Sequence, residues 1–313
     1  MDSFYISANA VVPFIVYIGF GIILKKAEIL SRELARNFNS VVFRGFFPIM
    51  IFYNLYKSRH TIQFSGSLLI TAMLVLSALI VVRSLIVRKT VKDPSKQPVI
   101  VQAVYRSNVL LFALPIAQSI YGDEAAATAT MLLAVIVPFY NMSSILLFEF
   151  FRGGKADPRR LFRKVITNPL ILGALVGLVS VAVKFDLPSS LDKSLSNISG
   201  MCTPMACIIL GATLQSSSIR KHVGYIVPTL AAKLILLPLL SLPLSMALGF
   251  SAMERFVFFS IFATPIASSS FPMARSMGGD GDLAGELLAA STLCSIVTIS
   301  LWIMLFNRLG ILY

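Results

Sequence analysis

Long apolar runs separated by short polar connections dominate this sequence. A helix that crosses a bilayer needs about 20 mostly apolar residues, and we expect ten such helices, at residues 7–24, 37–56, 66–87, 99–120, 125–151, 168–184, 194–215, 224–249, 254–276 and 284–306. The alternating polar and apolar residues of a membrane β-barrel do not occur, so helices are the remaining way to satisfy the backbone in lipid. The pattern therefore predicts an all-α membrane protein of ten transmembrane helices.

Composition and charge agree with this pattern. Hydrophobic residues make up 57% of the 313 residues, the mean hydropathy is +0.83, and charged residues account for only 13%, unlike soluble domains. Basic loop residues fall mostly on one face of the ten-span arrangement, and the opposite face holds only Lys57, Arg59, Lys184, Lys193, Arg255 and Arg308. Because basic loops favour the cytoplasm, we expect a multi-pass cell-membrane protein with both termini extracytoplasmic. The net charge of +13 thus reflects the orientation of the loops in the membrane. The basic residues are scattered among short loops, which argues against nucleic-acid binding.

Proline and glycine recur at a fixed distance in the two halves of the chain. Asn108, Pro115 and Gly122 are matched 157 positions later by Pro265, Pro272 and Gly279, and three pairs recur at 156 positions: Pro13 with Pro169, Gly21 with Gly177, and Pro48 with Pro204. These matches divide the chain into halves, 1–157 and 158–313, of five spans each. Because five is an odd number, the second half enters the membrane in the opposite sense, as in the inverted repeats of transporters.

The matched prolines lie inside spans four and nine and predict that both helices are broken. Proline lacks a backbone donor and clashes with the preceding turn, so we expect backbone groups near Pro115, Pro265 and Pro272 to lose their helical partners. Each such group is costly in lipid unless it faces protein or a hydrated cavity. Freed N–H groups and positive half-helix ends can hold an anion there, such as a carboxylate. The alternative is a packing kink without function.

Polar residues gather at the expected breaks. Asn108 can donate two hydrogen bonds to a carboxylate and Arg106 can add charge, although Arg106 can also snorkel or pair within the bundle, and each serine can bond its own helix. We expect Lys233, another basic residue within a span, to reach an interface. The candidate substrate-binding residues are Arg106, Ser107, Asn108 and Pro115 in span four, and Thr264, Pro265, Ser268, Ser269, Ser270 and Pro272 in span nine.

The order and spacing of these residues resemble the auxin efflux carrier family of membrane transporters, over essentially the whole chain. The resemblance implies a five-plus-five inverted repeat with spans four and nine crossing at proline breaks. It also implies a scaffold of spans one, two, six and seven, against which a transport domain of spans three to five and eight to ten moves by an elevator-like shift. The residues that carry it are Asn108 to Pro115 with Gly122-Asp123-Glu124, Asn168-Pro169, Pro204 with Leu210-Gly211-Ala212, and Pro265 with Ala274.

The resemblance also implies a cargo and its contacts. Family members carry organic anions, such as auxin in plants and malate or malonate in bacteria, and the plant exporters are dimers through the scaffold. The implied partners are therefore a small organic anion, the lipid bilayer and a second copy of the chain. Asn108 beside Pro115 matches the family's carboxylate-binding position, and Asn168 is a further candidate, with Leu170 as its alternative. The short connection from Arg152 to Thr167 resembles compact bacterial members.

Three other functions are alternatives to the transport of organic anions by a carrier. A sodium-coupled carrier similar to the bile acid sodium symporters shares the architecture, but its ion sites need carboxylates, and the cores of spans four and nine contain no Asp or Glu. An anion channel would line its pore with the same broken helices. An intramembrane enzyme is disfavoured because no His lies within a span, so no catalytic residue, metal or cofactor is expected. Proton coupling stays open, with His60 and His222 expected to be solvated at span ends.

Overall fold

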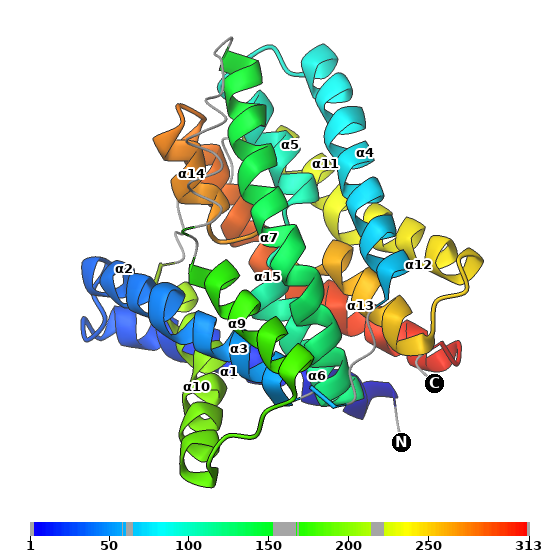
Figure 1. The fold of residues 1–313 in the computed structure, drawn as a ribbon. Coiled ribbons are helices and arrows are strands. Elements are labelled where there is room, and N and C mark those ends of the chain that lie inside the picture. The colour runs from blue at the N-terminus through cyan, green and yellow to red at the C-terminus, as the bar shows by residue number, and fades with distance from the viewer. Residues whose placement is uncertain are drawn as a thin grey trace.

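The computed structural model describes residues 3–57, 59–60, 65–152, 167, 169–213 and 222–311. Helices account for nearly all of this part of the chain, and the only pairing of extended backbone in it is one antiparallel bridge between Ser107 and Ile266. Figure 1 shows helices that cross one another at varied angles, with both ends of the chain near the lower right. The predicted all-α class is confirmed.

The helices follow the predicted spans in order. In the first half they are α1 (Ser3–Lys26), α2 (Arg32–Val41), the π-helical turn η1 (Val42–Phe46), α3 (Phe47–Lys57), α4 (Gly66–Thr90), α5 (Gln97–Tyr105), η2 (Val109–Ala113), α6 (Leu114–Tyr121) and α7 (Asp123–Arg152). In the second half they are α9 (Pro169–Val183), α10 (Ser189–Thr213), α11 (Val223–Ala231), η4 (Ala232–Leu236), α12 (Leu237–Ala247), α13 (Ala252–Ala263), α14 (Ser270–Ser276) and α15 (Gly281–Arg308).

Helix makes up most of the described residues in each of the ten predicted spans. Within the described residues, five helical stretches are long and apolar enough to cross a membrane: Gly66–Thr90, Asp123–Arg152, Ser189–Thr213, Val223–Ala247 and Gly281–Arg308. Two shorter apolar stretches are Val109–Tyr121 and Pro169–Val183. Exposed apolar side chains cover α4 and α12, which is typical of a surface that faces lipid; they include Ile70, Leu74, Val81, Leu85, Leu239 and Leu240.

Four helices, α1, α3, α9 and α10, pack closely along one another and form what we call the four-helix group. α1 lies along α10, α3 lies along α9, and α10 also packs against α3. Glycines allow the close approach. A Cβ at Gly21 of α1 would lie 2.8 Å from the carbonyl carbon of Ile208, and one at Gly173 of α9 would lie 2.8 Å from the Cα of Pro48. Small residues at such contacts favour helix association in membranes.

α2 packs against α10 of this group, and the remaining helices form a second body beside it. α4 packs against α5, α6 against α7, α12 against α13, and α14 against α15. The two bodies meet where α1 contacts α15 and α6, and where α3 contacts α7. In Figure 1 the second body occupies the upper and right parts of the molecule. The predicted boundary between the two sequence halves, near residue 157, lies outside the described residues.

Each of the three π-helical turns in the described residues ends two positions before a proline. These prolines are Pro48 after η1, Pro115 after η2 and Pro238 after η4. At Pro115, the N–H of Leu114 donates to the carbonyl of Val109, five residues back. Such a wider turn accommodates a proline ring that would clash with a carbonyl in a regular α-helix. Pro115 therefore lies in continuous helix, and the prediction of a break there is wrong.

Candidate functional site

Two interrupted helices cross inside the protein. One helix ends at Tyr105 and resumes after Asn108, and the other ends at Ala263 and resumes at Ser270. The two interruptions pair with each other. The Asn108 N–H donates to the Pro265 carbonyl at 2.8 Å, and the Ala267 N–H donates to the Arg106 carbonyl at 3.1 Å. These bonds satisfy backbone groups that have left their helices. We call residues 106–108 and 264–269 the crossing.

The prolines do not all mark these interruptions. Pro265 lies in the second one, as predicted. Pro272, however, lies in the first turn of α14, where the missing backbone donor costs no helical bond. The first interruption contains no proline and precedes Pro115. The predicted break at Pro272 is therefore wrong, as is that at Pro115, although spans four and nine are interrupted and do meet.

Arg106 is buried at the crossing and bonds only to neutral groups. Its side chain is 4% exposed. Nη1 donates to Ser144 Oγ at 2.9 Å, and Nη2 donates to Asn141 Oδ1 at 2.8 Å and to Ser269 Oγ at 2.9 Å. None of the ion pairs among the described residues includes this guanidinium. Arg106 therefore neither snorkels to an interface nor pairs with a carboxylate, and it ties the crossing to α7.

Lys233 is a second buried cation at the crossing. It is 0% exposed, and its Nζ donates to Ser107 Oγ. It too is absent from the ion pairs of the described part of the chain. The prediction that Lys233 reaches an interface is wrong. The helix begins at Val223, and ten residues of helix rise about 15 Å, which is farther than a lysine side chain extends.

Polar atoms without a hydrogen-bond partner flank both interruptions. They include the Nδ2 of Asn108, the Oγ1 of Thr264 and the Oγ of Ser270, and all three side chains are buried. Most buried polar groups in proteins are bonded, so such atoms call for an explanation. Ser268 is half-buried. Ser269 is exposed, and its Oγ accepts the hydrogen bond from Arg106. The crossing thus combines two cations with donors that have spare capacity.

Two candidate positions lie in or near span six. Asn168 lies outside the described residues, and its alternative, Leu170, is buried in α9. Leu170 has no polar side-chain atom to offer a carboxylate. The described residues therefore bring together the candidates of spans four and nine, without a contact from span six.

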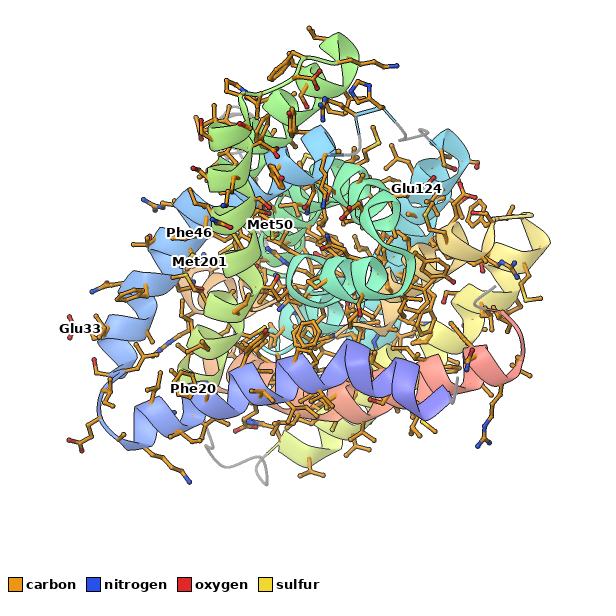
Figure 2. All side chains as sticks on the ribbon, turned by 90° about the horizontal axis from the view of Figure 1, so that it is seen from below. Phe20, Glu33, Phe46, Met50, Glu124 and Met201 are labelled. Atoms are coloured by element: carbon orange, nitrogen blue, oxygen red, sulfur yellow. The ribbon has the colours of Figure 1, made fainter. Side chains whose placement is uncertain are left out.

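A cavity of about 340 Å³ separates the four-helix group from α6. Pro115 lines it, together with Gln118 on α6 and with Asn54 and Lys57 on α3. The Nδ2 of Asn54 is buried without a partner. Further lining residues come from α1 and α10: Pro13, Phe14, Tyr17, Ser196, Ser199, Gly200, Thr203 and Pro204. Figure 2 looks at the molecule from below, with α1 and α10 on the near side and Met50, another lining residue, labelled beside them. The volume of the cavity suits a small molecule.

One of the two histidines is buried and paired with a carboxylate. His222 is 5% exposed, and its Nδ1 lies 2.9 Å from Glu286 Oε2. The prediction of a solvated His222 is therefore wrong, whereas His60 is exposed as expected. Glu286 was the available signal, because an acidic residue within an apolar span requires a partner.

Comparisons with known proteins match the chain to transporters. A family model described as membrane transport protein matches residues 6–303. "Uncharacterized transporter" of Methanothermobacter thermautotrophicus is 24% identical over 306 residues, which cover 95% of this chain and 97% of the relative. "Uncharacterized transporter YfdV" of Escherichia coli (strain K12) is 21% identical over 310 residues, covering 97% and 98%. "Putative malonate transporter" of Rhizobium meliloti is 26% identical over 143 residues, covering 44% and 43%.

Proposed function

Because the chain belongs to the membrane transport protein family, the auxin efflux carrier family, and is a multi-pass membrane transporter rather than an enzyme, we propose that it is a secondary carrier of small organic anions. The carboxylate of the cargo binds at the crossing. One observation carries this proposal: Arg106 and Lys233 are buried there, and the described residues provide only neutral partners for them. Buried charge is costly without a counter-charge, and an anionic cargo supplies one.

The remaining polar atoms supply directional bonds. Asn108 Nδ2 donates to a carboxylate oxygen, and the hydroxyls of Thr264 and Ser270, which also lack partners, can do the same. The helix that begins at Val109 adds N–H groups at its positive end. A dicarboxylate matches the two cations in charge. Malonate is the first cargo to test, because a distant partial relative carries that name.

We further propose an elevator-like movement. The four-helix group, with α2, is the scaffold, and α4–α7 with α11–α15 form the transport domain. The close glycine contacts within the group and the cavity beside α6 support this division. Lys57 on α3 and Asp123 at the start of α7 pair across the two bodies at 2.9 Å, and the shift breaks this pair. With both termini extracytoplasmic, Lys57 and the cavity lie toward the outside.

Two alternatives are distinguished by charge and by rate. A sodium-coupled carrier is disfavoured because the Lys233 ammonium lies beside Ser107 at the crossing and repels a second cation. An anion channel would conduct far faster than a carrier turns over. Replacing sodium by choline and recording planar-bilayer current test these two alternatives directly.

Exchange of radiolabelled malonate by purified protein in liposomes tests the main proposal. We expect the wild type to exchange external for internal malonate without sodium and without channel current. Asn108→Ala and Arg106→Gln should reduce exchange at least tenfold, because each removes a hydrogen bond to the charged carboxylate, which contributes about 1.5–3 kcal/mol. Asn197→Ala, the same change at an exposed asparagine, is the control and should keep full exchange. Full exchange by both crossing variants would contradict the proposed site.

A further inference from the structure

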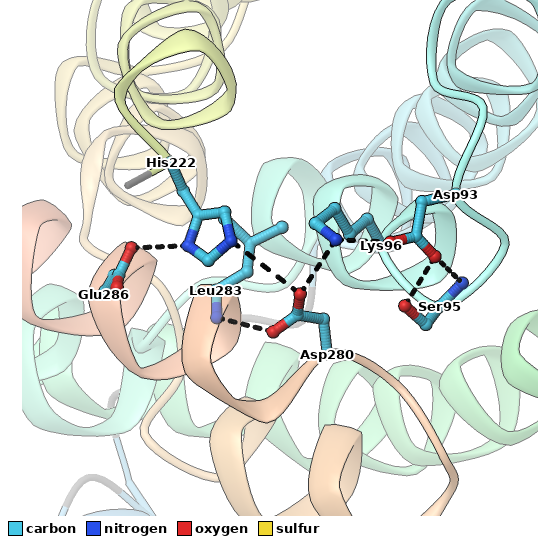
Figure 3. Close-up of polar contacts among 7 residues, drawn as sticks. All are labelled: Asp93, Ser95, Lys96, His222, Asp280, Leu283 and Glu286. Atoms are coloured by element: carbon cyan, nitrogen blue, oxygen red, sulfur yellow. Dashed lines mark hydrogen bonds and ion pairs between the residues drawn. The ribbon is translucent and has the colours of Figure 1, made fainter. Parts of the chain in front are cut away.

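A group of charged side chains lies where α5, α11 and α15 begin, and we call it the charge cluster: Asp93, Lys96, His222, Asp280 and Glu286 (Figure 3). His222 bridges two carboxylates, with Nδ1 2.9 Å from Glu286 Oε2 and Nε2 3.9 Å from Asp280 Oδ2. Lys96 Nζ lies 3.2 Å from the same Asp280 oxygen and also bonds to Asp93. Lys96 is therefore shared by two carboxylates, and His222 is the partner of the third, Glu286, so the charge on the imidazole decides the charge balance of the cluster.

Burial differs within the cluster. His222 is 5% exposed and Glu286 is 3% exposed. The side chains of Lys96 and Asp280 are 18% and 17% exposed. The His222–Glu286 pair is therefore closed off from water, and the partly exposed Asp280 and Lys96 lie on its route to solvent. An ionised Glu286 facing a neutral imidazole leaves a buried charge uncompensated, whereas a proton between the two removes that cost.

Three helices connect the charge cluster to the crossing. Each carries a cluster residue near its beginning and a residue that contacts the crossing further along. The link at α15 is Ser291, whose Oγ accepts a hydrogen bond from the Ile266 N–H at 3.2 Å. Movement of His222 relative to Glu286 therefore displaces helices that hold the proposed anion site. The linked pairs are Lys96 and Arg106 at the two ends of α5, His222 at the start of α11 with Lys233 in η4, and Glu286 with Ser291 on α15.

We propose that the His222–Glu286 pair binds a proton that is transported together with the organic anion. This inference rests on the proposed carrier function. Arg106 and Lys233 neutralise the carboxylates of the cargo at the crossing, but each cargo anion that binds still adds its negative charge to the transport domain. A proton shared between His222 Nδ1 and Glu286 Oε2 offsets one such charge. The transport domain then crosses the bilayer with less net charge.

The other groups that face His222 keep a fixed charge. The bond from Lys96 lowers the pKa of Asp93 to about 2. Burial acts to raise the pKa of Asp280, but a backbone N–H and Lys96 outweigh it and hold that pKa below its ordinary value. Arg275 of α14 lies against Gly281, the residue after Asp280, and places a further basic side chain near the cluster. The proton is therefore exchanged by the pair formed by His222 and Glu286, and not by its neighbours.

A metal site explains the cluster less well. Among the described residues, no three or more His, Cys, Asp and Glu side chains are placed to hold a metal ion. The ammonium of Lys96 already provides the cation that bonds to Asp280 and Asp93. A proton needs only the two atoms that lie 2.9 Å apart.

Malonate accumulation driven by a pH difference tests the proposal. Liposomes that are one pH unit more alkaline inside are held at zero membrane potential with potassium and valinomycin, and labelled malonate is added outside. We expect the wild type to accumulate malonate about tenfold for each proton coupled, since one pH unit is a tenfold driving ratio. His222→Gln and Glu286→Gln should still exchange malonate at equal pH but accumulate none. His60→Gln changes an exposed histidine and should behave as the wild type.

Each outcome is decisive. Exchange by all proteins, with accumulation lost only in the two cluster variants, supports the proton site. The proton site is overturned if the wild type exchanges malonate without accumulating it in response to pH, or if the two cluster variants keep that accumulation. Either result leaves the carrier function intact. Absence of exchange by the wild type overturns the carrier function, and the coupling with it. If a single variant loses exchange through misfolding, His222→Gln/Glu286→Gln removes both partners and is compared instead.

Discussion

Replacing Gly21 with alanine is expected to destabilise the scaffold, because α1 and α10 touch through their backbones there. The new Cβ would lie 2.8 Å from the carbonyl carbon of Ile208, whereas carbon atoms pack at about 3.5–4.0 Å. The helices must therefore separate by about 1 Å. Overpacking of this kind costs about 1–3 kcal/mol, and a rigid carbonyl cannot rotate away. Alanine returns about 1 kcal/mol through helix propensity, so with an overpacking cost near the middle of that range we expect a net loss of about 1 kcal/mol.

Gly19→Ala is a matched control two residues away on the same helix. A Cβ at Gly19 would meet nothing within 4 Å, so this variant gains helix propensity alone and should be stabilised by about 0.5–1 kcal/mol. Because both variants gain the same helix propensity, they should differ in stability by the overpacking cost alone, about 1–3 kcal/mol.

Thermal unfolding in detergent measures the difference through thiols on α10. Cys202 and Cys207 are buried there, so a maleimide dye reacts with them when α10 leaves its neighbours. The exposed Cys294 is first replaced by serine. We expect Gly21→Ala to unfold several degrees below the wild type and Gly19→Ala at or slightly above it. A Gly21→Ala midpoint equal to that of Gly19→Ala would refute the close contact.

Three further predictions concern charged and polar groups. Lys233→Met should weaken malonate binding at least tenfold in calorimetry without lowering the melting temperature, because it removes a buried cation that has no carboxylate partner; a lower melting temperature with unchanged affinity would assign Lys233 a structural role. Thr264→Val should weaken binding severalfold at unchanged stability, because its hydroxyl has no partner to lose; equal affinity removes it from the site. Asp93→Asn should lower the melting temperature at neutral pH. Lys96 lowers the Asp93 pKa to about 2, so this contribution is present above the unfolded pKa of about 3.9 and is lost as pH falls through about 2; a difference that persists at the lowest pH contradicts it.

The sequence was sufficient to predict the helices and the meeting of spans four and nine. Apolar length fixes where a helix can cross a membrane, and Asn108 and Pro265, matched across the two halves, are bonded to each other. The positions of the interruptions were only partly predictable. A proline can be absorbed by a π-helical turn, as at Pro115, and an interruption without proline, as at Arg106, is stable only because a distant segment supplies its hydrogen bonds.

The charged partners could not be read from the chain. Lys233 and His222 are both separated from their partners by long stretches of sequence, Ser107 in one case and Glu286 in the other. The number of residues between a side chain and the end of its helix predicts how far that side chain must reach to leave the membrane. It does not predict which neighbouring helix covers the side chain. The cavity beside Pro115 depends likewise on the packing of α1, α3 and α10 against α6.

The distance between a bound carboxylate and Asn108 is the sharpest test that the cargo binds at the crossing. Solid-state NMR dipolar recoupling can measure it with malonate labelled with ¹³C at its carboxylates and protein labelled with ¹⁵N at asparagine side chains. We expect a separation of about 4 Å, as for a carboxylate that accepts a hydrogen bond, and loss of that signal in the Asn108→Ala protein. Malonate bound at full occupancy without any such coupling in the wild type would contradict it.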